Sequence, residues 1–236
     1  TKHNPEIRRT LITICNYTLK YLSLPNKYGV VHAMWVAKRF SAPPTQPAIL
    51  ERPKTMSIQI GNAPCSWGVE FANDPRNPDW RSVLKDCADA GYRGIELGPV
   101  GFMPENPDIL GPALQEHDLT LIGGVVFRPF HDANAWEETL DGTLRTCQAL
   151  SAHGAKHLVL IDSISPRRAP TAGRADEAEQ MEQEEWSLYR DRIETCARIG
   201  AEEYGLTVGM HAHAGGFIDF EPELERLLSE IDESIL

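Results

Sequence analysis

Residues 207–216 read TVGMHAHAGG, a short apolar run that ends in two histidines and then two glycines. In a β-strand, side chains two positions apart point to the same face, so we expect His211 and His213 to lie side by side. Imidazole is the commonest protein ligand for metals and carries protons near neutral pH. The pattern predicts a strand whose carboxyl end forms a site. The alternative is that one histidine is buried and the other caps the loop.

The chain from Met56 onward alternates apolar runs with helical patterns. The expected strands cover residues 57–61, 93–97, 119–127, 157–162 and 206–211. The expected helices cover residues 80–88, 109–117, 136–150, 186–199 and 224–231, with Gly91 and Gly154 ending the first and third. The run HLVLID at 157–162 is nearly all apolar, so we expect burial on both of its faces. Five strand-then-helix units with short connections predict a parallel sheet.

Two architectures fit such a sheet, a doubly wound open sheet and a (β/α)8 barrel. The first strand is not followed by G-x-G-x-x-G, and no P-loop occurs in the chain. Polar and reactive residues instead follow several strands, among them Glu96, Arg128 and Asp162. Barrels distribute site residues over many strand ends in this way. We therefore favour an incomplete (β/α)8 TIM barrel with about five units present.

Charge divides the chain into two segments. The net charge is −11, to which residues 1–55 contribute +7 and residues 56–236 contribute −18. We predict that residues 1–55 are a basic extension, poorly ordered or not native, with a targeting peptide as the weaker alternative. Residues 56–236 would form the partial barrel. Their strong negative charge argues against a nucleic-acid surface.

Cysteine usage and hydropathy indicate the compartment. The five cysteines are scattered and include no C-x-x-C pair, which argues against a disulfide framework or a thiolate zinc site. No apolar run approaches the roughly 18 residues of a membrane helix. We therefore expect a cytoplasmic protein that binds neither membranes nor nucleic acid.

Three segments resemble a known family. These are NAPCSWG at 62–68, GYRGIELG at 91–98 and HAHAG at 211–215. They resemble the sugar phosphate isomerase/epimerase proteins of the xylose isomerase-like TIM-barrel superfamily, on the branch near inosose dehydratase. The likeness runs from about Met56 to Leu236. Later family segments that supply most metal ligands have no counterpart here, so the resemblance implies a barrel truncated at its C-terminus.

The resemblance implies a metal-dependent isomerase/epimerase or dehydratase that acts on a keto-sugar or cyclitol through an enediolate. A bound Mn²⁺, Co²⁺ or Mg²⁺ would polarise the carbonyl so that a side-chain base can remove the adjacent proton. By the same resemblance, His211 is the candidate metal ligand. The candidate catalytic residues are Glu96, His213 and Asp219. The choice among isomerisation, epimerisation and dehydration stays open.

Cys65, Trp67 and Asp162 are candidates for substrate binding. Each also has a structural alternative. Cys65 could be a packed small residue, Trp67 a core side chain, and Asp162 a helix or loop cap. Glu96 could likewise cap the helix that follows it.

Two other functions remain open at this point. A truncated barrel without catalytic activity would explain the missing segments. An amidohydrolase also uses His-x-His at a strand end, although on the first strand of its barrel. An unclosed sheet would expose its edges and half of a barrel interior, so we expect the chain to associate, with a homo-oligomer as one form. The expected ligand is a small sugar or cyclitol.

Overall fold

The computed structural model describes residues 11–14, 17–20 and 59–236. The chain divides into two units, residues 1–58 and 59–236. In the first unit, strand β1 (Leu11–Ile14) pairs antiparallel with β2 (Tyr17–Lys20). Most of the predicted N-terminal extension lies outside the described residues, so its order and origin stay predictions.

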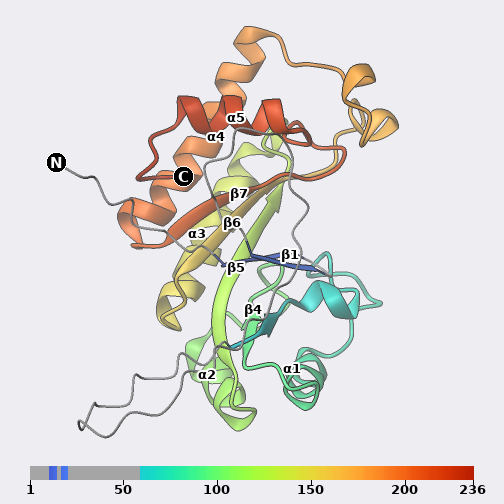
Figure 1. Ribbon diagram of the computed structural model, residues 1–236. Helices are drawn as coiled ribbons and strands as arrows, with labels where there is room; N and C mark the ends of the chain where they lie inside the picture. The colour runs from blue at the N-terminus through green and yellow to red at the C-terminus, as the bar shows by residue number, and fades with distance from the viewer. Residues whose placement is uncertain (1–10, 15–16, 21–58) are drawn as a thin grey trace, which may run out of the picture. The chain divides into compact units, whose positions relative to one another are not determined.

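The second unit is built on a parallel sheet whose five strands lie in sequence order (Figure 1). Its strands are β3 (Gly61–Asn62), β4 (Gly94–Glu96), β5 (Thr120–Arg128), β6 (His157–Asp162) and β7 (Thr207–His211). Its α-helices are α1 (Trp80–Asp89), α2 (Pro107–Glu116), α3 (Trp136–Ala152), α4 (Gln183–Arg198) and α5 (Glu221–Glu230). This is the predicted succession of five units. The predicted first strand, 57–61, lies partly outside the described residues, and its described part pairs only at its end.

Local sequence explains where the helices begin and end. The Asp79 side chain accepts hydrogen bonds from the backbone at the start of α1, and Asn106 does the same for α2. Gly91 and Gly154 follow α1 and α3 in the left-handed conformation, with φ of 89° and 69°, as predicted. Among the described residues, none of these helices is both long and apolar enough to cross a bilayer.

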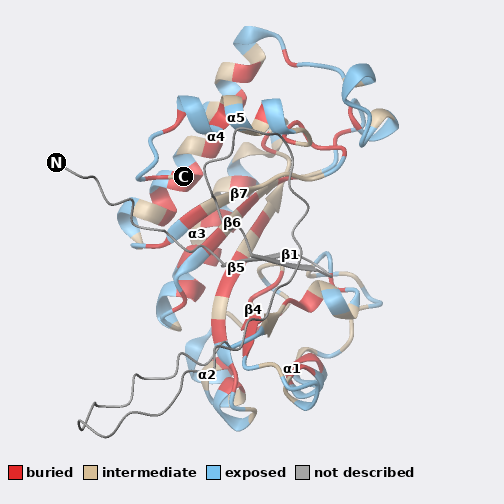
Figure 2. Ribbon diagram, in the orientation of Figure 1, coloured by how far each residue is buried: buried red, intermediate tan, exposed pale blue. Residues whose placement is uncertain are grey.

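The helices cover one face of the sheet, and the hydrophobic core lies between the helices and that face. A Cβ added at Gly124 of β5 would lie 3.2 Å from side chains of Thr146 and Leu150 in α3, so this face of β5 meets the helices. In β6, Leu158 and Leu160 are buried on the same side. Buried and half-buried residues alternate along β6, and in β5 this alternation is interrupted only at the buried pair Gly123 and Gly124 before it resumes at Val125; Figure 2 shows the alternating colours.

The expectation that residues 157–162 are buried on both faces is therefore wrong. Val159 and Ile161 of β6 are half-buried, because no helix of residues 59–236 covers the face opposite α3 and α4. We call this side of β4–β7 the inner face.

Candidate active site

The inner face ends in aromatic side chains at the carboxyl ends of its strands. His211 of β7 is aligned with Ile161 of β6, which is aligned with Phe127 of β5. In a parallel sheet, aligned residues point to the same side. His211 and Phe127 therefore share the inner face at the same end of the sheet.

The structure brings the two predicted histidines together. Strand β7 ends at His211, and His213 lies in the loop beyond it. Their ring centroids are 6.0 Å apart, with the ring planes at 75°. The His213 ring also lies 5.2 Å from the ring of Phe127. Both imidazoles thus lie where the strand ends of the inner face converge.

Burial and charge favour the neutral form of His211. Burial lowers the pKa of His211, and the neighbouring His213 lowers it further. Its ring makes no hydrogen bond with the described residues. The Nδ1 of His213 donates a hydrogen bond to the Ala214 carbonyl at 3.1 Å, which leaves Nε2 as an acceptor in the neutral ring.

Glu96 is the carboxylate of the inner face. It ends β4, and because the preceding Ile95 is fully buried on the helix side, Glu96 points the other way. Burial raises the pKa of the Glu96 carboxyl from 4.5 to about 7. The alternative that Glu96 caps the next helix is wrong, because Asn106 caps α2.

Strand register relates Glu96 to His211. Glu96 is aligned through β5 and β6 with Thr207, the first residue of β7. His211 lies four positions further along that strand. Strands of an eight-stranded α/β barrel shift by about one residue at each step, so three steps account for about three of those positions. In such a barrel, Glu96 and His211 belong to nearly the same layer.

Asp162 lies on the helix side of the sheet and is almost fully buried. Its Oδ1 accepts a hydrogen bond from His131 Nδ1 at 2.8 Å, and its Oδ2 accepts one from the Phe217 backbone at 2.9 Å. Burial and the neighbouring Asp162 carboxylate raise the pKa of the Tyr189 hydroxyl. These contacts correspond to the loop-anchoring alternative, and substrate binding by Asp162 stays a prediction.

Asp219 holds the loop that carries His213. Its Oδ2 accepts hydrogen bonds from the backbone of Gly215 at 3.0 Å and of Gly173 at 3.3 Å. The carboxylate thereby joins the loops that follow β6 and β7. A catalytic role for Asp219 stays a prediction, and the observed contacts are those of a positioning residue.

Cys65 and Trp67 belong to a short 3-10 helix, η1 (Pro64–Trp67), directly after β3. Both are half-buried, and Trp67 packs against the hydrophobic core. Asn62 Oδ1 holds this turn by accepting hydrogen bonds from Ala63 N at 2.8 Å and Ser66 Oγ at 2.7 Å. Substrate binding by Cys65 and Trp67 stays a prediction.

Sequence reasoning missed two neighbours of the predicted residues. Phe127 could have been found, because it lies on the same strand face as Val125 at the carboxyl end of a predicted strand. His131 gave no such signal, since its contact with Asp162 joins residues 31 positions apart.

A metal centre needs at least three protein ligands in most catalytic sites. The described residues contain no group of three or more His, Cys, Asp or Glu side chains that could hold a metal ion. Among the described residues, His211 therefore has no further metal ligands beside it, and the described residues do not form a metal centre by themselves.

Comparison with known proteins identifies the family. Residues 84–235 match the family described as xylose isomerase-like TIM barrel. The chain belongs to this family. An inosose dehydratase of Erwinia tasmaniensis is 25% identical over 179 residues, which cover 75% of this chain and 59% of that protein. The chain thus spans less than two thirds of the length of this relative.

Two solved structures share the fold. A xylose isomerase-like TIM-barrel protein from Mycobacterium smegmatis in complex with magnesium has a TM-score of 0.57 at 13% identity, over 75% of this chain and 62% of that one. The IOLI protein with a bound zinc atom has a TM-score of 0.54 at 14% identity, over 74% and 59%. The predicted xylose isomerase-like TIM-barrel fold is confirmed, with five of its strands in this chain.

Proposed function

We propose that the protein is a dehydratase or an isomerase/epimerase that acts on a keto-sugar or cyclitol. Membership of the xylose isomerase-like family and the similarity to an inosose dehydratase support this class of reaction. The observation that carries it is the pair of titratable groups on the inner face. Burial raises the pKa of Glu96 and lowers that of His211, so that near neutral pH one can give a proton while the other accepts one.

The shared first step is removal of a proton from the carbon beside the substrate carbonyl. The neutral His211 imidazole takes this proton, and protonated Glu96 donates one to the carbonyl oxygen, giving an enediol. Return of the proton to the other face gives an epimer. Return to the neighbouring carbon gives an isomer, and loss of a β-hydroxyl gives a dehydrated product. The His213 Nε2 acceptor is suited to a substrate hydroxyl, and Asp219 positions the loop that carries it.

A divalent metal would polarise the carbonyl further, as the resemblance implies for Mn²⁺, Co²⁺ or Mg²⁺. His211 is the ligand that this chain offers, but the described residues give it no companions, and an imidazole bound to a metal could not also take the substrate proton. The steps above are therefore assigned only to the side chains of this chain. A cytoplasmic location is part of the same proposal.

Proton exchange tests the first step without requiring turnover. The chain is incubated in D₂O with 2-keto-myo-inositol or with ketohexoses, and loss of the C–H signal beside the carbonyl is followed by proton NMR. Glu96→Gln and His211→Gln should each slow exchange by about 100-fold or more, the usual contribution of a positioned acid or base. Glu116→Gln, an exposed carboxylate at the end of α2, is the matched control and should leave exchange unchanged.

Exchange that is equally fast in both site variants would refute the assignment of Glu96 and His211. No exchange with any of these substrates would favour the alternative of an inactive barrel fragment. The amidohydrolase alternative has no support, because the His-x-His pair ends the fifth strand of this sheet rather than the first.

A further inference from the structure

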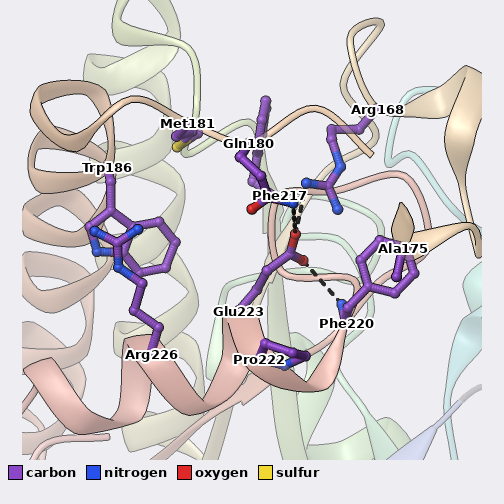
Figure 3. Close-up of a pocket in the computed structure, with 10 residues that line it drawn as sticks. All are labelled: Arg168, Ala175, Gln180, Met181, Trp186, Phe217, Phe220, Pro222, Glu223 and Arg226. Carbon is purple, nitrogen blue, oxygen red and sulfur yellow. Dashed lines mark hydrogen bonds and ion pairs between the residues drawn. The ribbon is translucent and has the colours of Figure 1, made fainter. Parts of the chain in front are cut away.

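A pocket of about 310 Å³ lies on the helix side of the sheet, between α4, α5 and the loop after β6 (Figure 3). Its walls are largely aromatic and apolar, with Trp186, Phe217 and Phe220 as the aromatic members. Two arginines, Arg168 and Arg226, also line it. None of these residues belongs to the inner face that carries Glu96 and His211.

The carboxylate in the pocket, Glu223, has no capacity left for a ligand. Its Oε1 accepts hydrogen bonds from Arg168 Nη1 at 2.8 Å and from Gln180 Nε2 at 3.3 Å. Its Oε2 accepts from the backbone of Asp219 at 2.9 Å and of Phe220 at 3.0 Å. With both oxygens engaged, Glu223 serves to hold Arg168 and to cap α5.

Arg168 keeps a donor without a partner. Its guanidinium lies close to two aromatic rings, 5.3 Å from the centroid of Phe217 and 5.4 Å from that of Phe220. Only 1% of the residue is exposed, yet its Nη2 has no hydrogen-bond partner among the described residues. Buried donors of this kind nearly always have a partner, so this one requires an explanation.

Arg226 supplies a second cation across the pocket. Its guanidinium lies over the Trp186 ring, 4.1 Å from the centroid, and its Nη2 donates to Gln183 Oε1 at 2.7 Å. Figure 3 shows Trp186 and Arg226 on one side of the pocket and Phe220 on the other. The Arg226 Nε donates to Glu230 Oε1 at 3.1 Å, so Arg226, like Arg168, already has a carboxylate partner.

We propose that this pocket binds a small aromatic carboxylate. The flat ring would pack against the aromatic walls, and the carboxylate would accept hydrogen bonds from Arg168 Nη2 and from Arg226. A volume of about 310 Å³ is at the small end of ligand pockets and fits one ring with its acid group. The polar face of a sugar would find too few partners on these walls.

Benzoate is the probe, and benzyl alcohol is the uncharged control ligand of the same size. Binding to the 236-residue chain is measured by ligand-observed NMR titration. Benzoate should bind saturably, and benzyl alcohol should bind about tenfold more weakly or worse, because it lacks the charge-assisted hydrogen bonds. Equal affinity for the two ligands, or no saturable binding of benzoate, would overturn the proposal.

Three variants locate the binding. Arg226→Gln should weaken benzoate binding about tenfold. Because 37% of the Arg226 side chain is exposed, circular dichroism is a sufficient control for folding of this variant. Arg168→Lys keeps a cation beside Glu223 but removes the forked second nitrogen, so it should weaken binding similarly. Arg198→Gln, a paired arginine on α4 away from the pocket, is the matched control and should bind like the parent chain. Unchanged binding in Arg226→Gln would overturn the proposal, whether or not Arg168→Lys folds.

Discussion

The effect of Glu96 on the free energy of unfolding depends on pH. Its pKa is about 7 in the folded chain and 4.5 for an ordinary glutamate, so between these values folding takes up a proton. The protonated form is tolerated on the inner face, and the charged form is disfavoured by burial. Glu96 therefore destabilises the fold progressively as pH rises from about 4.5 to about 7, and fully above that.

Replacing Glu96 by Gln should remove this pH-dependent destabilisation. We expect Glu96→Gln to unfold at the same urea concentration as the parent near pH 4.5, and to be more stable by on the order of 1–3 kcal/mol at pH 8. Urea titrations at several pH values, followed by circular dichroism, measure the difference. A stability difference that does not change with pH would show that the Glu96 carboxyl titrates normally.

At the residue scale, sequence spacing predicts neighbours only when they are close in the chain. His211 and His213 are two positions apart, and their ring centroids lie 6.0 Å apart although His213 lies in the loop beyond the end of β7. The pairing of Arg168 with Glu223 joins residues 55 positions apart, and that of His131 with Asp162 joins residues 31 apart. Such contacts depend on how loops return over the sheet, which local pattern does not specify.

At the element scale, close packing of the turn after α4 against the sheet can be tested with a single methyl group. The helix continues into a π-helical turn, η5 (Ile199–Glu203), where Gly200 faces β6 and β7. A Cβ at Gly200 would lie 2.8 Å from Val208 Cγ2 and 2.9 Å from Leu158 Cδ2. We expect Gly200→Ala to destabilise the fold by about 1–3 kcal/mol in urea unfolding. Helix propensity alone would favour alanine over glycine. A decrease in the free energy of unfolding would therefore report the steric clash of the added methyl group.

Gly209 in β7 is the matched control. A Cβ there meets nothing within 4 Å, because it points to the inner face. Gly209→Ala should change the free energy of unfolding by no more than about 0.5 kcal/mol. A large loss at Gly209, or none at Gly200, would contradict this assignment of the two faces.

The elements themselves were largely predictable, and the error in β6 has one cause. Hydrophobic periodicity and terminating glycines located the helices, as Gly91 illustrates for α1. An apolar strand predicts apolar surroundings, but it cannot specify whether this chain supplies them. In β6, Leu158 and Leu160 meet helices, whereas Val159 and Ile161 face a side that the helices of residues 59–236 leave uncovered.

At the scale of the whole molecule, the inner face is an apolar surface that stays half-exposed. Its half-buried apolar side chains are Ile122, Val125, Phe127, Val159 and Ile161. In the described part of the chain, β3 and β7 each pair with only one neighbouring strand. Apolar sheet surfaces and open strand edges favour association between chains. We therefore expect the sedimentation coefficient of the 236-residue chain to rise with concentration.

A charge on the inner face should oppose this association. Ile161→Lys places an ammonium among the half-buried side chains, and sedimentation velocity should show a larger fraction of monomer than in the parent chain. Leu188→Lys is the matched control, because Leu188 has a side chain of the same size as isoleucine but lies on α4, with 53% of its surface exposed. If the inner face mediates association, only Ile161→Lys should raise the fraction of monomer. Leu188→Lys should leave that fraction unchanged, because the helix side of the sheet already presents charged residues to solvent. A parent chain that sediments as a monomer at every concentration and unfolds cooperatively would mean that this face does not mediate association.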